Sequence, residues 1–312
     1  MIVYYHNPDY LFGIHTSFLG EYKKTIETAI LNPYIRCFQI YTSNRSFNKQ
    51  KYDIDDIFEA KNILEKSGKK MFIHSSLLLN MCGSVDPNNL SAQKLEKYKE
   101  LFCFDMDIGV VFGSGSVIHF GSCKDKDLGT ILFVKNIKEC LSMKTPEAKL
   151  FSKRLNISVD QFISKRLCIL ENSAGEGTKL GHKMQDIINI LKSIDDSRVG
   201  LCLDTAHLFG YGEFDLRYHL KNFLDYINRE NIIKYIKCFH FNDSKVDLGS
   251  KKDRHESLGH GMIFKDNLDV MNEFIEFFKN NKIYFIRESH NLCYEDDYEI
   301  ILNYTKMCNK II

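Results

Sequence analysis

The sequence predicts an α/β protein in which eight strands alternate with helices and close into a single (β/α)8 barrel, the TIM-barrel architecture. Short apolar runs rich in Ile, Val, Leu, Phe and Cys recur eight times, and each is followed by a segment whose apolar residues have helical spacing. The chain of 312 residues has a suitable length for one such barrel. No linker or shift in composition divides it, so we expect residues 1–312 to form one domain.

The first two units show the alternation clearly. A short strand is expected over residues 12–17, and the helix after it, over 21–31, repeats apolar residues at helical spacing. A second strand is expected over 37–42. The second helix, over 54–66, ends before Gly68, which is a common C-terminal stop for a helix.

The third and fourth units are longer. A strand over 71–75 precedes a long helix over 91–107 that begins at a serine, a favoured N-cap residue. A strand over 116–120 and a helix over 128–143 follow. The polar, partly helical segment 145–165 then departs from the alternation, and we interpret it as an insertion-like excursion from the barrel.

The second half of the chain repeats the alternation four more times. Its strands are expected to be apolar, β-favouring runs, and its helices amphipathic segments. The expected strands are 167–171, 199–204, 236–241 and 283–288, and the expected helices are 184–194, 216–228, 267–279 and 296–307.

Composition narrows the class of protein. Hydrophobic residues make up 44% and charged residues 27% of the chain, and no apolar stretch approaches the ~20 residues of a membrane span. The N-terminus lacks a secretory signal. The ten cysteines show no Cys-x-x-Cys spacing, so we expect free thiols and an intracellular, reducing compartment such as cytoplasm or nucleus. The net charge of +1 neither favours nor excludes nucleic acid as a partner.

Residues that commonly bind metal ions lie at or just beyond the ends of the third to eighth predicted strands. They are His74, His119, Glu171, Asp204, His207, His240, Asp253, His255 and Glu288. The active sites of (β/α)8 barrels are built at the C-terminal ends of the strands. A catalytic zinc takes three protein ligands, so nine candidates indicate more than one ion. Because clustered divalent ions suit phosphoryl transfer, the residues favour a phosphodiester substrate.

Four long motifs occur in order along the chain at or just beyond these strand ends. They are 171–178 (ENSAGEGT), 200–207 (GLCLDTAH), 239–245 (FHFNDSK) and 253–259 (DRHESLG). Together they resemble the endonuclease IV family of apurinic/apyrimidinic endonucleases, and the resemblance extends over about residues 13–288, nearly the whole chain.

This resemblance implies three zinc ions per chain. The first ion would take His74, His119 and Glu171, the second Asp204, His240 and Glu288 with Glu171 as a bridge, and the third His207, Asp253 and His255. It also implies that Glu171 and Glu288 are catalytic, with Glu288 orienting the water that attacks phosphorus in line while the third ion stabilises the departing 3′ oxygen.

The implied reaction is a step of base excision repair. The enzyme would cut duplex DNA 5′ to an abasic site, leaving a 3′-hydroxyl and a 5′-deoxyribose phosphate, after flipping the target nucleotide out of the stack. We expect a monomer without membrane partners.

The resemblance also implies DNA contacts, and the chain departs from the family pattern at two of them. Leu77 stands where the family usually has a Tyr that stacks at the lesion, and Arg45 comes one position earlier than expected in the loop that penetrates the duplex. Lys245 and Arg254 lie in the last two motifs, where they could contact phosphates.

Two other functions remain open. A sugar isomerase or epimerase of the same barrel superfamily would use four residues around one metal, and Glu171, Asp204, His240 and Glu288 fit that quartet. The five other candidates would then have no role, and they are His74, His119, His207, Asp253 and His255. A catalytically silent DNA-binding barrel is the second alternative, but a mere binder has no need of a bridging carboxylate.

Overall fold

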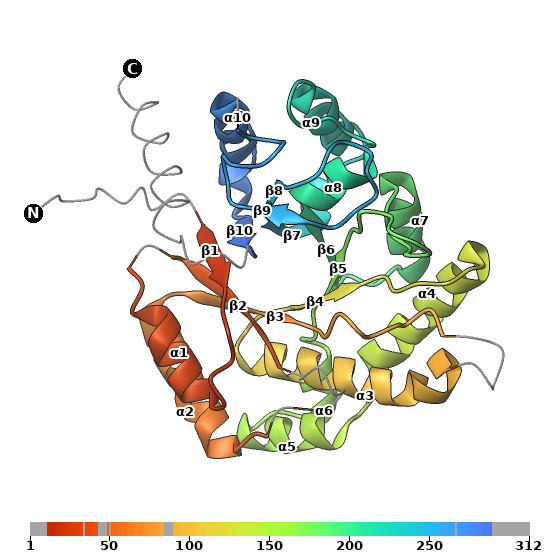
Figure 1. The fold of residues 1–312 in the computed structure, drawn as a ribbon. Helices are drawn as coiled ribbons and strands as arrows, with labels where there is room; N and C mark the ends of the chain where they lie inside the picture. Colours follow the sequence, from red (N-terminus) through yellow and green to blue (C-terminus); the bar gives the residue numbers. More distant parts are fainter. Residues whose placement is uncertain are drawn as a thin grey trace, which may run out of the picture.

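The computed structural model describes residues 11–33, 35–42, 49, 51–83, 90–265 and 267–288, and only the backbone at 90–93 and 268. In this part of the chain, eight parallel strands form a closed barrel in the order β1-β10-β7-β6-β5-β4-β3-β2 (Figure 1). The strands are β1 Phe12–His15, β2 Cys37–Tyr41, β3 Lys70–His74, β4 Ser116–His119, β5 Cys168–Glu171, β6 Val199–Asp204, β7 Ile236–His240 and β10 Tyr284–Arg287. The predicted (β/α)8 barrel is confirmed.

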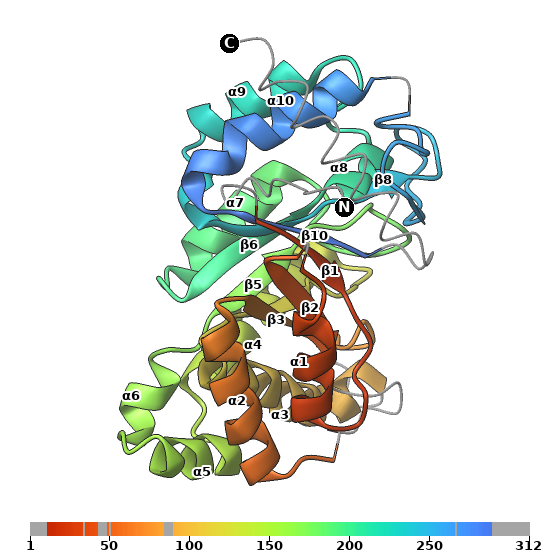
Figure 2. The ribbon, with the colours of Figure 1, turned by 90° about the vertical axis from the view of Figure 1, so that its left-hand side faces the viewer.

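Helices surround this barrel, with α9 and α10 on one side and α1 and α2 on the opposite side (Figures 1 and 2). The helices in the described residues are α1 Tyr22–Ile30, α2 Ile54–Ser67, α3 Leu90–Val111, α4 Lys126–Ser142, α5 Pro146–Arg154, α6 Val159–Ile163, α7 Met184–Ile194, α8 Thr205–Tyr211, α9 Leu220–Arg229 and α10 Leu268–Phe278. The predicted helix over 296–307 lies outside the described residues. Across the described parts of the chain, none of the helices has the length and apolar character needed to span a membrane.

Local chemistry explains where several helices begin and end. Asp53 caps α2 by accepting the backbone N–H groups of Asp55 and Asp56, and the helix ends at Gly68, whose φ of 69° is in the left-handed region. The insertion-like segment 145–165 folds into α5 and α6. Thr145 caps α5 by accepting the N–H of Ala148 at 2.9 Å.

Two helical stretches after β6 differ from the sequence prediction. The predicted helix over 216–228 begins later, as α9, because the Asp215 side chain accepts the N–H of Arg217 at 3.1 Å and forms a turn there. The loop expected after Asp204 contains the short helix α8, which Asp204 caps by accepting the N–H of His207 at 2.8 Å.

The interior of the barrel is filled by a buried layer of one residue from each of seven strands. These residues are Cys37, Phe72, Val117, Ile169, Cys202, Cys238 and Ile286. Because side chains alternate between the two faces of a strand, the residue two positions further along also points into the barrel. Those residues are Gln39, His74, His119, Glu171, Asp204, His240 and Glu288. The packing of the core therefore aims six of the nine predicted ligands at one point above it.

Candidate metal centre

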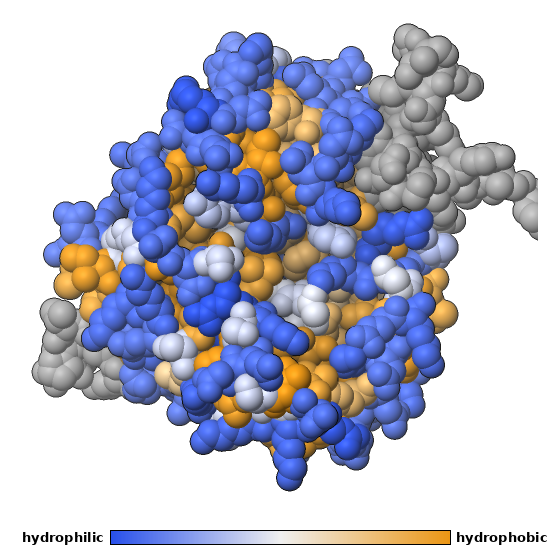
Figure 3. Space-filling model, turned by 180° about the vertical axis from the view of Figure 1, so that it is seen from behind, coloured by the Kyte–Doolittle hydropathy of each residue, from blue (hydrophilic) through white to orange (hydrophobic). Residues whose placement is uncertain are grey.

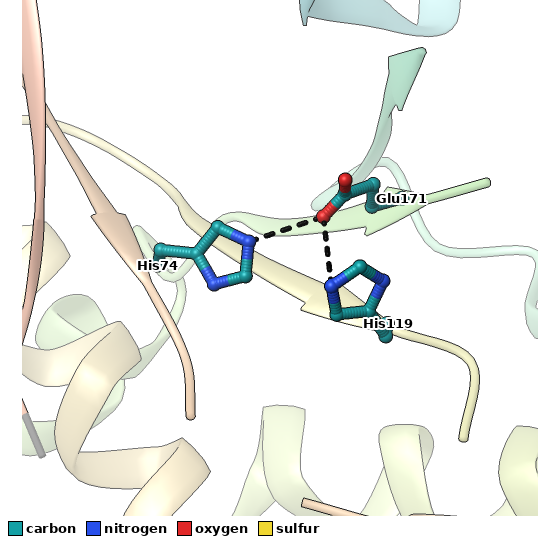
Figure 4. A group of neighbouring side chains, drawn as sticks. All are labelled: His74, His119 and Glu171. Carbon is teal, nitrogen blue, oxygen red and sulfur yellow. Dashed lines mark hydrogen bonds and ion pairs between the residues drawn. The ribbon is translucent and has the colours of Figure 1, made fainter. Parts of the chain in front are cut away.

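The first group of candidate ligands consists of His74, His119 and Glu171, whose ligand atoms lie within 4.8 Å of one another. Figure 4 shows both imidazoles facing one carboxylate oxygen: Glu171 Oε2 is 3.1 Å from His74 Nε2 and 3.4 Å from His119 Nε2. Glu171 and His74 are each 1% exposed, so bulk water does not separate the carboxylate from the imidazole ring. Such nitrogen and oxygen donors suit zinc.

The second group shares Glu171 with the first. Glu171, Asp204, His240 and Glu288 also bring one ligand atom each within 4.8 Å of the others. His240 Nδ1 lies 2.9 Å from Glu171 Oε1 and 3.1 Å from Glu288 Oε2. The two oxygens of Glu171 therefore face different groups, which is the arrangement that a bridging carboxylate needs.

A third group lies beside the second. Asp204, His207 and His255 bring ligand atoms within 4.8 Å of one another. Asp253 lies between the two rings, with Oδ2 3.1 Å from His207 Nε2 and Oδ1 3.2 Å from His255 Nε2. The structure thus brings all nine of the predicted metal-binding side chains together at the C-terminal ends of the strands.

Hydrogen bonds on the far side of three rings fix which nitrogen is free to bind a cation. The carbonyl of Ser75 accepts from His74 Nδ1 at 2.6 Å, and the carbonyl of Asn172 accepts from His207 Nδ1 at 2.9 Å. The side-chain oxygen of Gln39 accepts from His240 Nε2 at 3.1 Å. Each ring therefore keeps a lone pair on the nitrogen that faces the carboxylates, as metal-binding histidines do.

Two buried ring nitrogens support a cation at the third group. His207 Nε2 and His255 Nε2 have no hydrogen-bond partner among the described residues, although Asp253 lies beside both. A lone pair that faces a carboxylate oxygen is unfavourable unless a proton or a cation lies between them. The donor set therefore fits a bound metal ion.

Electrostatics lead to the same conclusion. Burial would raise the pKa of Glu171, but the imidazoles of His119 and His240 outweigh burial and hold that pKa well below its usual range. Burial likewise opposes protonation of His207, yet Asp204 and Asp253 raise the pKa of His207 to about 10. These carboxylates require positive charge nearby, and divalent cations would supply it while leaving the imidazoles neutral.

Sequence reasoning missed two side chains in the same ring, Gln39 and His15. Gln39 Nε2 donates to Glu288 Oε1 at 2.9 Å and lies 3.0 Å from His15 Nδ1, while its oxygen accepts from His240. The Gln39 amide thereby orients two candidate ligands, His240 at the end of β7 and Glu288 just beyond β10. The alternation from Cys37 to Gln39 could have revealed this position, because both residues point into the barrel.

Two asparagines orient Asp204 in the same way. Asn172 Oδ1 accepts the backbone N–H of Asp204 at 2.6 Å, and Asn242 Nδ2 donates to Asp204 Oδ2 at 2.7 Å. Asn242 Oδ1 also accepts the N–H of Glu288 at 2.9 Å. These contacts set the direction of the carboxylates before any ligand binds.

Asp253 and His255 are positioned by a small hairpin that the sequence did not reveal. β8, Asp243–Ser244, pairs in antiparallel fashion with β9, His255–Glu256, next to α8 (Figure 1). The buried Asp243 carboxylate accepts the N–H groups of Gly261 at 3.0 Å and Ile263 at 2.8 Å. A Cβ at Gly261 would come within 2.5 Å of Asp243 Oδ1, so this position requires glycine.

The predicted DNA contacts are only partly described. Arg45 lies outside the described residues. Leu77, three residues beyond His74, is 61% exposed. Lys245 and Arg254 are exposed and adjacent, since the N–H of Lys245 donates to the carbonyl of Arg254 at 2.9 Å.

Known proteins are similar to this chain in sequence and in fold. A model of the family described as xylose isomerase-like TIM barrel matches residues 35–276. A probable endonuclease 4 of Chlorobium phaeobacteroides is 34% identical over 265 residues, which are 81% of this chain and 84% of that protein. An apurinic-apyrimidinic endonuclease 1 of Plasmodium berghei is 32% identical over 278 residues, which are 84% of this chain and 45% of that protein. The crystal structure of endonuclease IV from Thermus thermophilus superposes with a TM-score of 0.72 at 22% identity, covering 96% of this chain and 99% of that one.

Proposed function

Because this chain belongs to the endonuclease IV family of xylose isomerase-like TIM barrels, we propose that it is a zinc-dependent apurinic/apyrimidinic endonuclease. It hydrolyses the phosphodiester 5′ to an abasic site in duplex DNA and leaves a 3′-hydroxyl and a 5′-deoxyribose phosphate. Similarity to proteins named endonuclease 4 and apurinic-apyrimidinic endonuclease supports the substrate class.

The observation that carries the proposal is the position of Glu171. Its two oxygens face separate ligand groups, one with His74 and the other with His240. A protein that used one metal ion would need only one of these groups. Shared ligands between adjacent groups are typical of sites that hold two or more ions close together for phosphoryl transfer.

Bound zinc ions would lower the pKa of a water molecule and neutralise charge on the phosphate during hydrolysis. Within the site, Gln39 positions Glu288 through Oε1 and Asn242 positions it through Oε2, so that the carboxylate would orient the attacking water and hold its proton. Asp253 and His255, on the hairpin, would hold the ion on the side of the departing 3′ oxygen.

The exposed side chains around the rim would position the DNA. Lys245 and Arg254 lie next to each other on the hairpin and would contact phosphates on either side of the lesion. Leu77, which is 61% exposed, would pack against the space that the missing base leaves. An apolar side chain there makes a weaker platform than an aromatic ring, so we expect modest discrimination between lesions.

A sugar isomerase or epimerase is the alternative, because Glu171, Asp204, His240 and Glu288 also form one coherent group. That activity leaves the third group without a purpose. His207 is nevertheless buried and His255 is partly buried, both face Asp253, and the β8–β9 hairpin holds His255. The construction of the third group therefore favours the endonuclease.

Metal analysis combined with an incision assay tests the proposal. We expect about three zinc ions per chain, and a nick at the abasic site in a labelled duplex but none in the intact duplex. The Glu288→Gln variant should bind abasic DNA but cut it far more slowly, whereas Glu59→Gln, an exposed change on α2, should cut normally. Recovery of about one metal ion per chain, or no nick with zinc present, would refute the proposal.

A further inference from the structure

The opposite end of the barrel contains a pocket of about 570 Å³, a volume typical of small-molecule sites. Its floor is apolar and includes Phe72, Leu167, Ile236 and Tyr284. These residues lie at or near the beginnings of strands, on the side turned away in Figure 1. Figure 3 shows that side, where hydrophobic residues (orange) lie between hydrophilic ones (blue).

Two glycines allow close packing at this end of the barrel. Gly115, which lines the pocket, and Gly200 lie two positions before Val117 and Cys202 of the buried layer. A Cβ at Gly200 would come within 2.6 Å of Lys237 Cγ. Glycine at this position therefore allows Lys237 to lie along the mouth of the barrel.

Among the described residues, five lysines line the pocket and no acidic residue does. They are Lys70, Lys165, Lys234, Lys237 and Lys282. None of the five forms an ion pair with another described residue, whereas lysines elsewhere, such as Lys61 and Lys221, pair with carboxylates. Like charges that surround one hollow repel each other, and an anion in the hollow would offset that repulsion.

Lys70 is one of the two lysines in this set that are partly buried, and Lys237 is the other. The more detailed contacts are those of Lys70. It begins β3 and points into the barrel two positions before Phe72, and its ammonium group donates to the carbonyl of Gly113. Burial lowers the pKa of Lys70, because a half-buried ammonium group without a counter-ion is poorly solvated. A negatively charged ligand would supply that counter-ion.

We propose that this pocket binds a nucleotide, with its base against Phe72 and Tyr284 and its phosphates on the lysines. The two rings lie 5.3 Å apart in an edge-to-face arrangement and offer an apolar wall for a base. Lysine provides the mobile point charges that bind phosphate. A small ligand fits the observations better than a duplex, because the apolar floor is recessed. The inference is independent of the endonuclease proposal.

A single-tryptophan reporter provides a direct test, because the chain contains no tryptophan. Tyr284→Trp puts a reporter on the pocket wall, and titration of the metal-loaded protein with ADP should give a saturable fluorescence change in roughly the micromolar to millimolar range. Tyr218→Trp, at a tyrosine that is 68% exposed, is the matched control and should give none. Calorimetric titration of the unmodified protein with ADP provides a second measurement.

Charge-reversal variants distinguish ADP binding in this pocket from ADP binding at the metal centre, which could also attract phosphates. The double change Lys234→Glu with Lys237→Glu should weaken ADP binding more than about tenfold, and the incision rate should not change. Lys24→Glu, at an exposed lysine on α1, should leave ADP binding intact. Each of four results would overturn the proposal. The protein does not bind ADP, or the double variant binds ADP as tightly as the unmodified protein does. Alternatively, adenosine or pyrophosphate binds as tightly as ADP, or intact duplex displaces ADP.

Discussion

The barrel contains two clusters of buried charge, and their polar atoms are partnered differently. In the Asp107–Arg166 pair, Arg166 Nε and Nη2 both lie 2.8 Å from Asp107 Oδ1. Arg166 Nη1 donates to the carbonyls of Cys140 and Met143, each at 2.7 Å, and Thr145 donates to Asp107 Oδ2 at 2.6 Å. One positive and one negative charge cancel, and both carboxylate oxygens are occupied.

The cluster at the C-terminal rim is not neutralised in this way. Its four carboxylates face imidazoles rather than guanidinium groups, and buried nitrogens of His207 and His255 have no hydrogen-bond partner among the described residues. A buried pair whose opposite charges cancel each other supports structure. A buried set whose lone pairs converge is instead prepared for a ligand.

The same comparison gives the segment 145–165 a role. Thr145 caps α5 and also bonds to Asp107 on α3, while Arg166 follows the segment directly. Both ends of the excursion therefore attach to one buried carboxylate. The segment is anchored to the barrel through the neutral cluster and takes no part in the rim.

The largest effect should come from Glu171→Gln in the rim cluster. The amide removes the charge that both the first and the second ligand groups share, so we expect incision to fall by more than about a thousandfold. Elemental analysis should show fewer than three metal ions per chain. Binding of abasic duplex, measured by fluorescence anisotropy, should persist because the outer surface is unchanged. Retention of activity within tenfold would show that Glu171 is not shared between ions.

Arg166→Met tests the neutral cluster and should act on stability alone. Loss of the guanidinium group strands the buried Asp107 carboxylate, so we expect the free energy of unfolding in urea to fall by ~3–5 kcal/mol. Metal content and the incision rate of the folded protein should stay unchanged. Arg154→Met is the matched control: Arg154 is exposed and 2.6 Å from Asp55, so its loss should cost less than ~1 kcal/mol.

A double variant sharpens that prediction. Adding Asp107→Leu to Arg166→Met removes the stranded carboxylate and should restore most of the lost stability. Equal destabilisation of the single and double variants would mean that packing, and not charge, accounts for the cost of Arg166→Met.

The sequence predicted the barrel and the rim ligands because both are encoded locally. Each strand is a short apolar run, and six of the nine ligands, His74, His119, Glu171, Asp204, His240 and Glu288, come at the end of such a run. The neutral cluster could not be predicted, because Asp107 and Arg166 are 59 positions apart and meet only through the packing of α3 against the excursion. The short elements α8, β8 and β9 escaped notice since they hold too few residues for a periodic pattern.

Gln39 was missed for a different reason. The alternation from Cys37 places its side chain inside the barrel, but its partners come from β7 and the end of β10. Which ring and which carboxylate it meets depends on how the strands stagger around the barrel. Its role therefore appears only in the tertiary structure.

Gln39→Leu should have an intermediate effect on the rim cluster. The change deprives His240 Nε2 of its acceptor and Glu288 Oε1 of its donor, so we expect zinc affinity at the second group to fall about 10–100-fold. Competition with a fluorescent chelator measures this affinity independently of activity. Gln185→Leu on α7, where the exposed amide donates to Asn189 at 3.1 Å, should leave the zinc affinity unchanged. Equal zinc affinity in the two variants would contradict a positioning role for Gln39.

A pH-dependent effect on stability is expected at Asp105, a buried carboxylate that belongs to neither cluster. Burial raises its pKa to about 7, with Thr42 as a hydrogen-bond donor that only partly compensates. The folded state therefore keeps a proton that the unfolded state loses near pH ~4. The stabilisation from that proton is complete below pH ~4 and is lost as the pH rises toward 7, by at most ~1.4 kcal/mol per pH unit. Asp105→Asn should remove this slope, so the difference in unfolding free energy between variant and wild type should increase from pH 5 to 7 and then level off. Asp127→Asn, at an exposed position on α4, is the matched control and should show no such change. If the difference for Asp105→Asn does not depend on pH, then Asp105 is ionised in the folded state and is held by partners like those of Asp107.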